Sequence, residues 1–142
     1  MPNPTVLFVC THNSARSQLA EALLRHDHGD RFESFSAGTE ETRVKPEALT
    51  VLEEIGVDTS PLFSKTVDRF VEEPADYVIT VCDAAGEACP WLPARVKLVH
   101  HGFEDPSNET SSPEARVEAF RKTRDEIRGW LEETFSGEVP QL

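Results

Sequence analysis

A short apolar run at residues 5–9 (TVLFV) most constrains what this chain can fold into. The run is rich in β-branched and aromatic residues and, apart from Thr5, has no polar side chain. It therefore predicts a central strand of a parallel sheet that is covered on both faces. Leucines and alanines at helical spacing follow as far as His26, and Gly29 ends that pattern, which predicts a helix.

The loop between this strand and this helix begins at Cys10 and reaches Arg16 and Ser17. A loop that leads into a helix points several free backbone N–H groups at one spot, where the helix dipole also favours negative charge. Arg16 adds a planar fork that matches two oxygens of a phosphate-like group. The loop therefore predicts a cradle for a tetrahedral oxyanion, formed by Thr11, His12, Asn13, Ser14, Ala15 and Arg16.

Cys10 is the predicted nucleophile of this cradle. A helix N-terminus and a nearby cation favour the thiolate form of a cysteine, which is the reactive one. Ser17, at the helix start, is placed to donate a hydrogen bond to the sulfur, and Asn13 is the residue best suited to a positive φ. The alternative interpretation of the motif is a buried structural cysteine followed by an ordinary surface helix.

Two further cysteines can be placed near the same edge of the sheet. Cys82 closes a second apolar run at residues 77–81, and ligands of open α/β sheets bind at the carboxyl ends of strands. Cys89 follows after six residues that include Gly86 and three alanines. Three thiols in a cytosolic chain favour catalysis or metal binding over a disulfide framework. The alternative is that Cys82 and Cys89 pack as small apolar side chains.

Asp105 is the candidate proton donor. It stands before Pro106, in a turn that follows a strand candidate at residues 96–99. A leaving oxygen needs a proton, and a carboxylic acid at the entrance of a site is suited to supply it. An Asp-Pro pair on its own indicates no more than a turn.

These segments together resemble the thioredoxin-coupled arsenate reductases, which are relatives of the low-molecular-weight protein tyrosine phosphatases. The matching segments are VCTHNSARSQ (residues 9–18), SAG (36–38), Cys82, CP (89–90) and HGFEDP (101–106). The resemblance implies a single domain over residues 1–142. It also implies an α/β, flavodoxin-like three-layer fold, with a central parallel sheet of about four strands flanked by helices.

The resemblance also implies a mechanism. Arsenate binds in the cradle, Cys10 attacks arsenic, and Asp105 protonates the departing oxygen. Cys82 then attacks Cys10 and arsenite leaves; Cys89 attacks Cys82, and thioredoxin reduces the resulting disulfide by exchange. The scheme needs no metal or organic cofactor.

Some members of the family bind a potassium ion beneath the loop. Asn13, Glu21 and Ser36 match residues at that ion site, but Phe63 and Lys65 stand where relatives have a threonine and an aspartate. One hypothesis is that the Lys65 ammonium replaces the ion and holds Asn13 and Ser36 by hydrogen bonds. The alternative is that Lys65 is a solvated surface lysine.

Two rival functions stay open. Cys10, Arg16 and Asp105 would suffice for a low-molecular-weight tyrosine phosphatase, and weak phosphatase activity is expected in either case. A zinc-binding module would use Cys82, Cys89 and either His100 or His101, although the spacing of the two cysteines is wider than in common zinc knuckles.

The remaining strand candidate covers residues 31–36, and two more helices are expected. One begins near Pro46 and ends before Gly56; the other begins near residues 111–114 (SSPE) and carries one apolar face.

A net charge of −12 argues against binding to nucleic acid or to an anionic membrane surface. The same charge repels an oxyanion, so the local cations of the cradle must overcome it. No basic region precedes the first apolar run, so we expect no signal peptide and a cytoplasmic location. We also expect a monomer.

Overall fold

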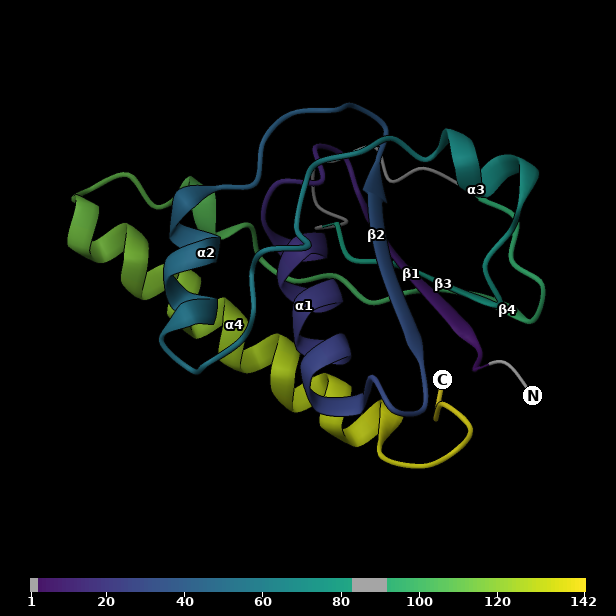
Figure 1. Ribbon diagram of the computed structural model, residues 1–142. Helices are drawn as coiled ribbons and strands as arrows, with labels where there is room; N and C mark the ends of the chain where they lie inside the picture. Colours follow the sequence, from purple (N-terminus) through teal and green to yellow (C-terminus); the bar gives the residue numbers. More distant parts are fainter. Residues whose placement is uncertain (1–2, 83–91) are drawn as a thin grey trace.

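The structure is a computed structural model that describes residues 3–82 and 92–142. Four parallel strands form one sheet in the order β2-β1-β3-β4 (Figure 1). The strands are β1 (Thr5–Cys10), β2 (Glu33–Gly38), β3 (Tyr77–Thr80) and β4 (Lys97–His100). The helices are α1 (Arg16–His28), α2 (Pro46–Glu53), α3 (Asp68–Glu72) and α4 (Pro113–Phe135), with a 3-10 turn, η1 (Pro106–Asn108). The expected α/β fold with a parallel sheet of about four strands is confirmed.

The alternating side chains of β1 separate the two faces of the sheet. Val6 and Phe8 belong to the larger apolar core, to which α1, α2 and α4 contribute. These three helices lie together on one side of the sheet (Figure 1). Leu7 and Val9 face the opposite way, into a smaller core that includes Phe70 of α3. All four side chains are fully buried. The strand is therefore covered on both faces, as its unbroken apolar run predicts.

Two predicted strands differ from the structure at their ends. β2 begins at Glu33, two residues later than expected, because the N–H groups of Arg31 and Phe32 still bond to the His28 carbonyl at the end of α1. The strand then continues to Gly38, which pairs with Cys10. β4 is shifted by one residue and runs to His100, which pairs with Thr80.

The helices agree more closely with prediction. Pro46 and Pro113 both stand in the first turn of a helix, and the Ser112 hydroxyl accepts a hydrogen bond from the Ala115 N–H at 3.0 Å. α3 was not predicted because its five residues are too few to show a period. Within residues 3–82 and 92–142, no helix is long and apolar enough to span a membrane.

The strand order matters for the site because β1 lies between β2 and β3. The carboxyl ends of these three strands therefore meet at one edge of the sheet, where Cys10 ends β1, Gly38 ends β2 and Cys82 follows β3. Cys89 lies outside the described residues.

Candidate active site

The loop from Cys10 to Arg16 joins β1 directly to α1, so the sulfur lies at the N-terminal end of a helix. Asn13 has a φ of 48° and is the only non-glycine residue with positive φ among the described residues. This confirms the expectation for Asn13, whose short amide tolerates the left-handed region. Cys10 is 3% exposed and lines a pocket of about 360 Å³.

Gly38 lets β2 approach the loop closely. A Cβ atom at this position would lie 2.6 Å from the carbonyl oxygen of Thr11 and 2.8 Å from the nitrogen of Asn13. Both are backbone atoms, which cannot swing aside as a side chain can. Only glycine therefore fits behind the loop in this conformation.

The Asn13 side chain organises the back of the loop. Its Oδ1 accepts hydrogen bonds from Gln18 Nε2 and from the backbone N–H of Lys65, both at 2.9 Å. Its Nδ2 donates to the hydroxyl oxygens of Ser17 at 2.9 Å and Ser36 at 3.0 Å. Two donors on one side of the amide and two hydroxyls on the other fix its orientation.

That orientation determines the direction of the bond between Ser17 and Cys10. The Ser17 Oγ lies 2.8 Å from the Cys10 sulfur and already accepts a hydrogen bond from Asn13. Its own hydroxyl hydrogen is therefore left for the sulfur. The predicted role of Ser17 as a donor to Cys10 fits this geometry, and a donor at this position stabilises a thiolate.

Arg16 lies between the pocket and the segment that carries Asp105. Its Nη1 donates to the Phe103 carbonyl at 3.0 Å, and its Nη2 lies 3.6 Å from the Asp105 carboxylate. The Arg16 side chain is 5% exposed, so the guanidinium is held in place. The structure therefore brings Asp105, which is far away in the sequence, to the loop that carries Cys10 and Arg16.

An acid catalyst must carry a proton, but the surroundings of Asp105 favour its ionised form. Burial opposes its charge, but hydrogen bonds from the Ser107 hydroxyl at 2.6 Å and the Ser107 N–H at 2.9 Å favour the carboxylate. Arg16 and Lys45 add to that preference, and together these groups lower the pKa of Asp105. Asp105 is therefore ionised at neutral pH.

Lys45 is a site residue that the sequence did not reveal. It lines the same pocket as Cys10, and its backbone N–H donates to the Ser14 carbonyl at 2.8 Å. Its ammonium makes no hydrogen bond or ion pair to any residue that the structure describes. Lys45 thus provides the pocket with a second cation beside Arg16, which helps to offset the overall negative charge. The signal was weak because Lys45 stands just before Pro46 in a stretch without periodicity.

The other lining residues also depart in part from prediction. Thr42 and Ser107 line the pocket and were not predicted, whereas Thr11 and Asn13 were predicted to contact the substrate and do not line it. Thr11 instead bonds through its carbonyl to the N–H of Glu40 at 3.1 Å. The predicted His12, Ser14 and Ala15 do line the pocket.

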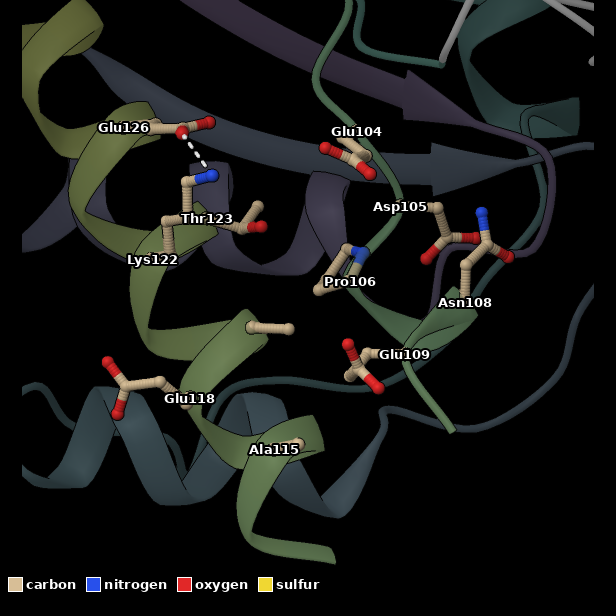
Figure 2. A pocket seen from close by; sticks show the side chains of 11 residues that line it. Glu104, Asp105, Pro106, Asn108, Glu109, Ala115, Glu118, Lys122, Thr123 and Glu126 are labelled. Atoms are coloured by element: carbon tan, nitrogen blue, oxygen red, sulfur yellow. Dashed lines mark ion pairs between the residues drawn. The ribbon is translucent and has the colours of Figure 1, made fainter. Parts of the chain in front are cut away.

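A larger hollow of about 580 Å³ adjoins this pocket between residues 104–109 and α4 (Figure 2). Its lining contains five carboxylates, from Glu104, Asp105, Glu109, Glu118 and Glu126. Its one lysine, Lys122, lies 3.9 Å from Glu126. Such a lining repels anions, so the smaller pocket above Cys10 is the candidate oxyanion site.

Cys82 is fully buried at the end of β3. Its sulfur lies 3.8 Å from the carbonyl oxygen of Val9, the residue before Cys10, and the Val81 N–H bonds to that same oxygen at 2.9 Å. The Cys82 sulfur therefore contacts the backbone of β1, the strand that ends at Cys10.

Lys65 contributes to the loop in a way only partly expected. Its ammonium lies 2.9 Å from the Phe63 carbonyl, 3.2 Å from Glu21 Oε1 and 3.4 Å from the Ser36 hydroxyl. The predicted hydrogen bond between the ammonium and Asn13 is not found. The backbone N–H of Lys65 donates to Asn13 instead. Burial lowers the pKa of Lys65, while the Glu21 carboxylate, which is 2% exposed, opposes that change.

Comparison with known proteins gives consistent results. Residues 5–138 match the model of the low molecular weight phosphotyrosine protein phosphatase family. An arsenate reductase from Halalkalibacterium halodurans is 39% identical over 127 residues, which cover 89% of this chain and 91% of that protein.

Solved structures show the same similarity. A structure described as an arsenate reductase in the phosphate binding state superimposes with a TM-score of 0.75 at 30% identity, covering 91% of this chain and 94% of that one. A thioredoxin-dependent arsenate reductase from Corynebacterium glutamicum gives a TM-score of 0.66 at 35% identity, covering 90% of this chain and 60% of that one.

Proposed function

Because the chain belongs to the low molecular weight phosphotyrosine protein phosphatase family and is similar to arsenate reductases over most of its length, we propose that it reduces arsenate to arsenite. The observation that carries the proposal is the position of the Cys82 sulfur, 3.8 Å from the carbonyl oxygen of Val9, the residue directly before Cys10. Hydrolysis needs one thiol at this site, whereas reduction of arsenic needs a second thiol that can attack the first.

The first step is attack on arsenic. Arsenate lies between the cations of Arg16 and Lys45, and the Cys10 thiolate forms an S–As bond while one As–O bond breaks. The negative charge of the bound oxyanion raises the pKa of Asp105, so this carboxyl takes up a proton in the complex and passes it to the departing oxygen, which leaves as water.

The second step transfers two electrons to arsenic. The Cys82 sulfur attacks the Cys10 sulfur, an S–S bond forms, and the electron pair of the S–As bond leaves with arsenic as arsenite. Cys89 then attacks Cys82 and releases Cys10, and thioredoxin reduces the Cys82–Cys89 disulfide by thiol exchange. The thioredoxin dependence of the Corynebacterium relative supports this choice of reductant.

We propose further that Lys65 replaces the potassium ion expected from the resemblance. The oxygens that would hold an ion here, from Glu21, Ser36 and Phe63, already surround the ammonium. A second cation at the same place would be repelled, so the residues present do not fit potassium in addition to lysine.

The alternative function is hydrolysis of phosphate monoesters through a phosphocysteine. The description of the matching family favours it, and Cys10, Arg16 and Asp105 provide the groups it needs. We propose weak phosphatase activity as a side reaction of the same pocket.

A single-turnover experiment without reductant separates these functions. The reduced wild-type protein should release one equivalent of arsenite per chain and form a Cys82–Cys89 disulfide. Cys89→Ser should also release one equivalent but stop at a Cys10–Cys82 disulfide, whereas Cys82→Ser should release none. Peptide mass mapping identifies each disulfide.

Steady-state turnover then tests the reductant. Arsenate-dependent NADPH oxidation with thioredoxin and thioredoxin reductase should occur for the wild type and be lost in both cysteine variants. Full turnover in either variant would overturn the relay. Hydrolysis of an aryl phosphate that exceeds arsenate reduction would favour the phosphatase.

A further inference from the structure

Another pocket, of about 330 Å³, is lined by residues of α1, β2, α3 and the segment 61–66. Its volume is within the range of small-molecule sites, about 300–1,000 Å³. Three phenylalanines, Phe35, Phe63 and Phe70, contribute to its walls. The Phe63 ring is 62% exposed, so an aromatic ligand in the pocket would cover apolar surface that now faces water.

The charged residues of this pocket are unbalanced. Arg25, Lys65 and Arg69 supply three cations, and Glu21 supplies the one carboxylate. Arg25 Nη2 lies 2.8 Å from Glu21 Oε2, and the Lys65 ammonium lies 3.2 Å from Glu21 Oε1. Two cations thus share a single acid.

Arg69 adds the third cation without an acid of its own. Within residues 3–82 and 92–142 its side chain makes no hydrogen bond or ion pair. Its guanidinium lies against aromatic rings, 5.3 Å from the centre of the Phe35 ring and 5.2 Å from that of Phe70. The pocket therefore carries two excess positive charges beside aromatic walls, in a chain whose net charge is −12.

We propose that this pocket is a binding site for a small aromatic anion. Its carboxylate, sulfonate or phosphate group would bond to the guanidinium of Arg69, and its ring would pack against Phe63 and Phe35. A neutral aromatic molecule would leave the excess charge unpaired, and a small inorganic anion would leave the rings exposed. The proposal is independent of the arsenate chemistry, because none of these side chains lines the pocket above Cys10.

Calorimetric titration with naphthalene-2-sulfonate tests the proposal. We expect binding to the wild type that is at least about tenfold tighter than binding of neutral naphthalene-2-sulfonamide. Arg69→Gln should weaken sulfonate binding about tenfold. Arg69 is exposed on a short helix, so this variant should keep the fold.

Arg95→Gln is the matched control. It removes the same charge from an exposed position before β4, at the opposite edge of the sheet from β2, and should leave the affinity unchanged. Lys45→Gln should also leave it unchanged, because Lys45 lines the other pocket. In NMR spectra, the amide chemical shifts of residues 63–70 should change when naphthalene-2-sulfonate is added.

Three results would overturn the proposal. The first is absence of binding to the wild type, and the second is equal binding of the sulfonate and the sulfonamide. The third is an effect of Arg69→Gln no larger than that of Arg95→Gln.

Discussion

The hydroxyl of Ser17 lies 2.8 Å from the sulfur of Cys10 and is turned toward it by the amide of Asn13. Ser17→Ala removes this donor. A hydrogen bond to a charged group is worth about 1.5–3 kcal/mol, so the variant should react with iodoacetamide at neutral pH at least about tenfold more slowly at Cys10. The rate of alkylation, followed by mass spectrometry of the Cys10 peptide, measures the change.

Ser34→Ala is the control for Ser17→Ala. Ser34 is also a buried serine, and its hydroxyl bonds to the backbone carbonyl of Glu21 at 2.9 Å, away from the sulfur. The control should alkylate at the wild-type rate. An equal loss of alkylation rate in both variants would mean that general loosening of α1 causes the effect. Ser17 would then not be a group that activates Cys10.

Lys45→Gln should weaken the binding of oxyanions more than it slows the chemical step. The lost attraction should raise the KM for arsenate and the Kd for sulfate by about five- to tenfold at low ionic strength, with kcat nearly unchanged. The effect should shrink as salt is added. Lys45→Arg should restore affinity, and Lys97→Gln on β4 is the charge-matched control. A wild-type KM in Lys45→Gln would show that Arg16 recruits the anion alone.

Asp105→Asn should change how sulfate binding depends on pH. The groups around Asp105 lower its pKa. A bound anion raises that pKa, so anion binding takes up a proton as the pH falls toward the pH at which Asp105 titrates. At neutral pH the wild-type carboxylate repels sulfate, and Asp105→Asn should therefore bind it more tightly. The difference should close as Asp105 of the wild type becomes protonated. Parallel pH profiles would contradict the assigned role of Asp105.

Lys65→Met should destabilise the fold and disturb the loop, because Glu21 then keeps Arg25 as its one remaining cation. We expect a loss of about 1–3 kcal/mol in urea unfolding, against less than about 1 kcal/mol for Lys122→Met on the surface of α4. Wild-type turnover should be equal in potassium and sodium chloride. Strong activation of the wild type by potassium would contradict the replacement of the ion by Lys65.

Gly38→Ala should displace the backbone of the loop that forms the oxyanion site. The added methyl group meets backbone atoms of Thr11 and Asn13, so the loop must move, and we expect a loss of about 1–3 kcal/mol together with weaker sulfate binding. Gly129→Ala is the contrasting variant, since nothing lies within 4 Å of its added Cβ on α4. It should stabilise the protein by up to about 1 kcal/mol. Wild-type sulfate affinity in Gly38→Ala would show that the loop adapts without cost.

The sequence was most informative where local pattern and chemistry coincide. The apolar run at residues 5–9 and the helical spacing after Arg16 placed Cys10, Arg16 and Ser17 correctly, because a strand, a loop and a helix in succession leave little freedom. Asp105 came from its turn and from the resemblance. The position of Cys82 followed from the edge rule for parallel strands.

The sequence was least informative where a residue acts through the tertiary structure. Lys45 reaches the pocket only because the segment after β2 folds back over the loop, where its N–H bonds to Ser14. Lys65 was recognised by its position, but the bond to Asn13 comes from its backbone, and no pattern of side chains indicates that. The lowered pKa of Asp105 depends on Ser107 and Arg16 together, and so on distances that a sequence does not contain.

The placement of β1 between β2 and β3 also sets the order in which this protein acquires its chemistry during synthesis. The segment that carries Cys10, α1 and β2 leaves the ribosome first, and the bond between Cys82 and Val9 spans 73 positions. A nascent chain can therefore contain both strands that hold the loop before Cys82 has been translated, but the Phe103 carbonyl that holds the Arg16 guanidinium follows later still. The two sulfurs can therefore come to the same edge of the sheet only when β3 docks on β1, and the pocket above Cys10 is complete only after the segment that carries Phe103 and Asp105 has been added.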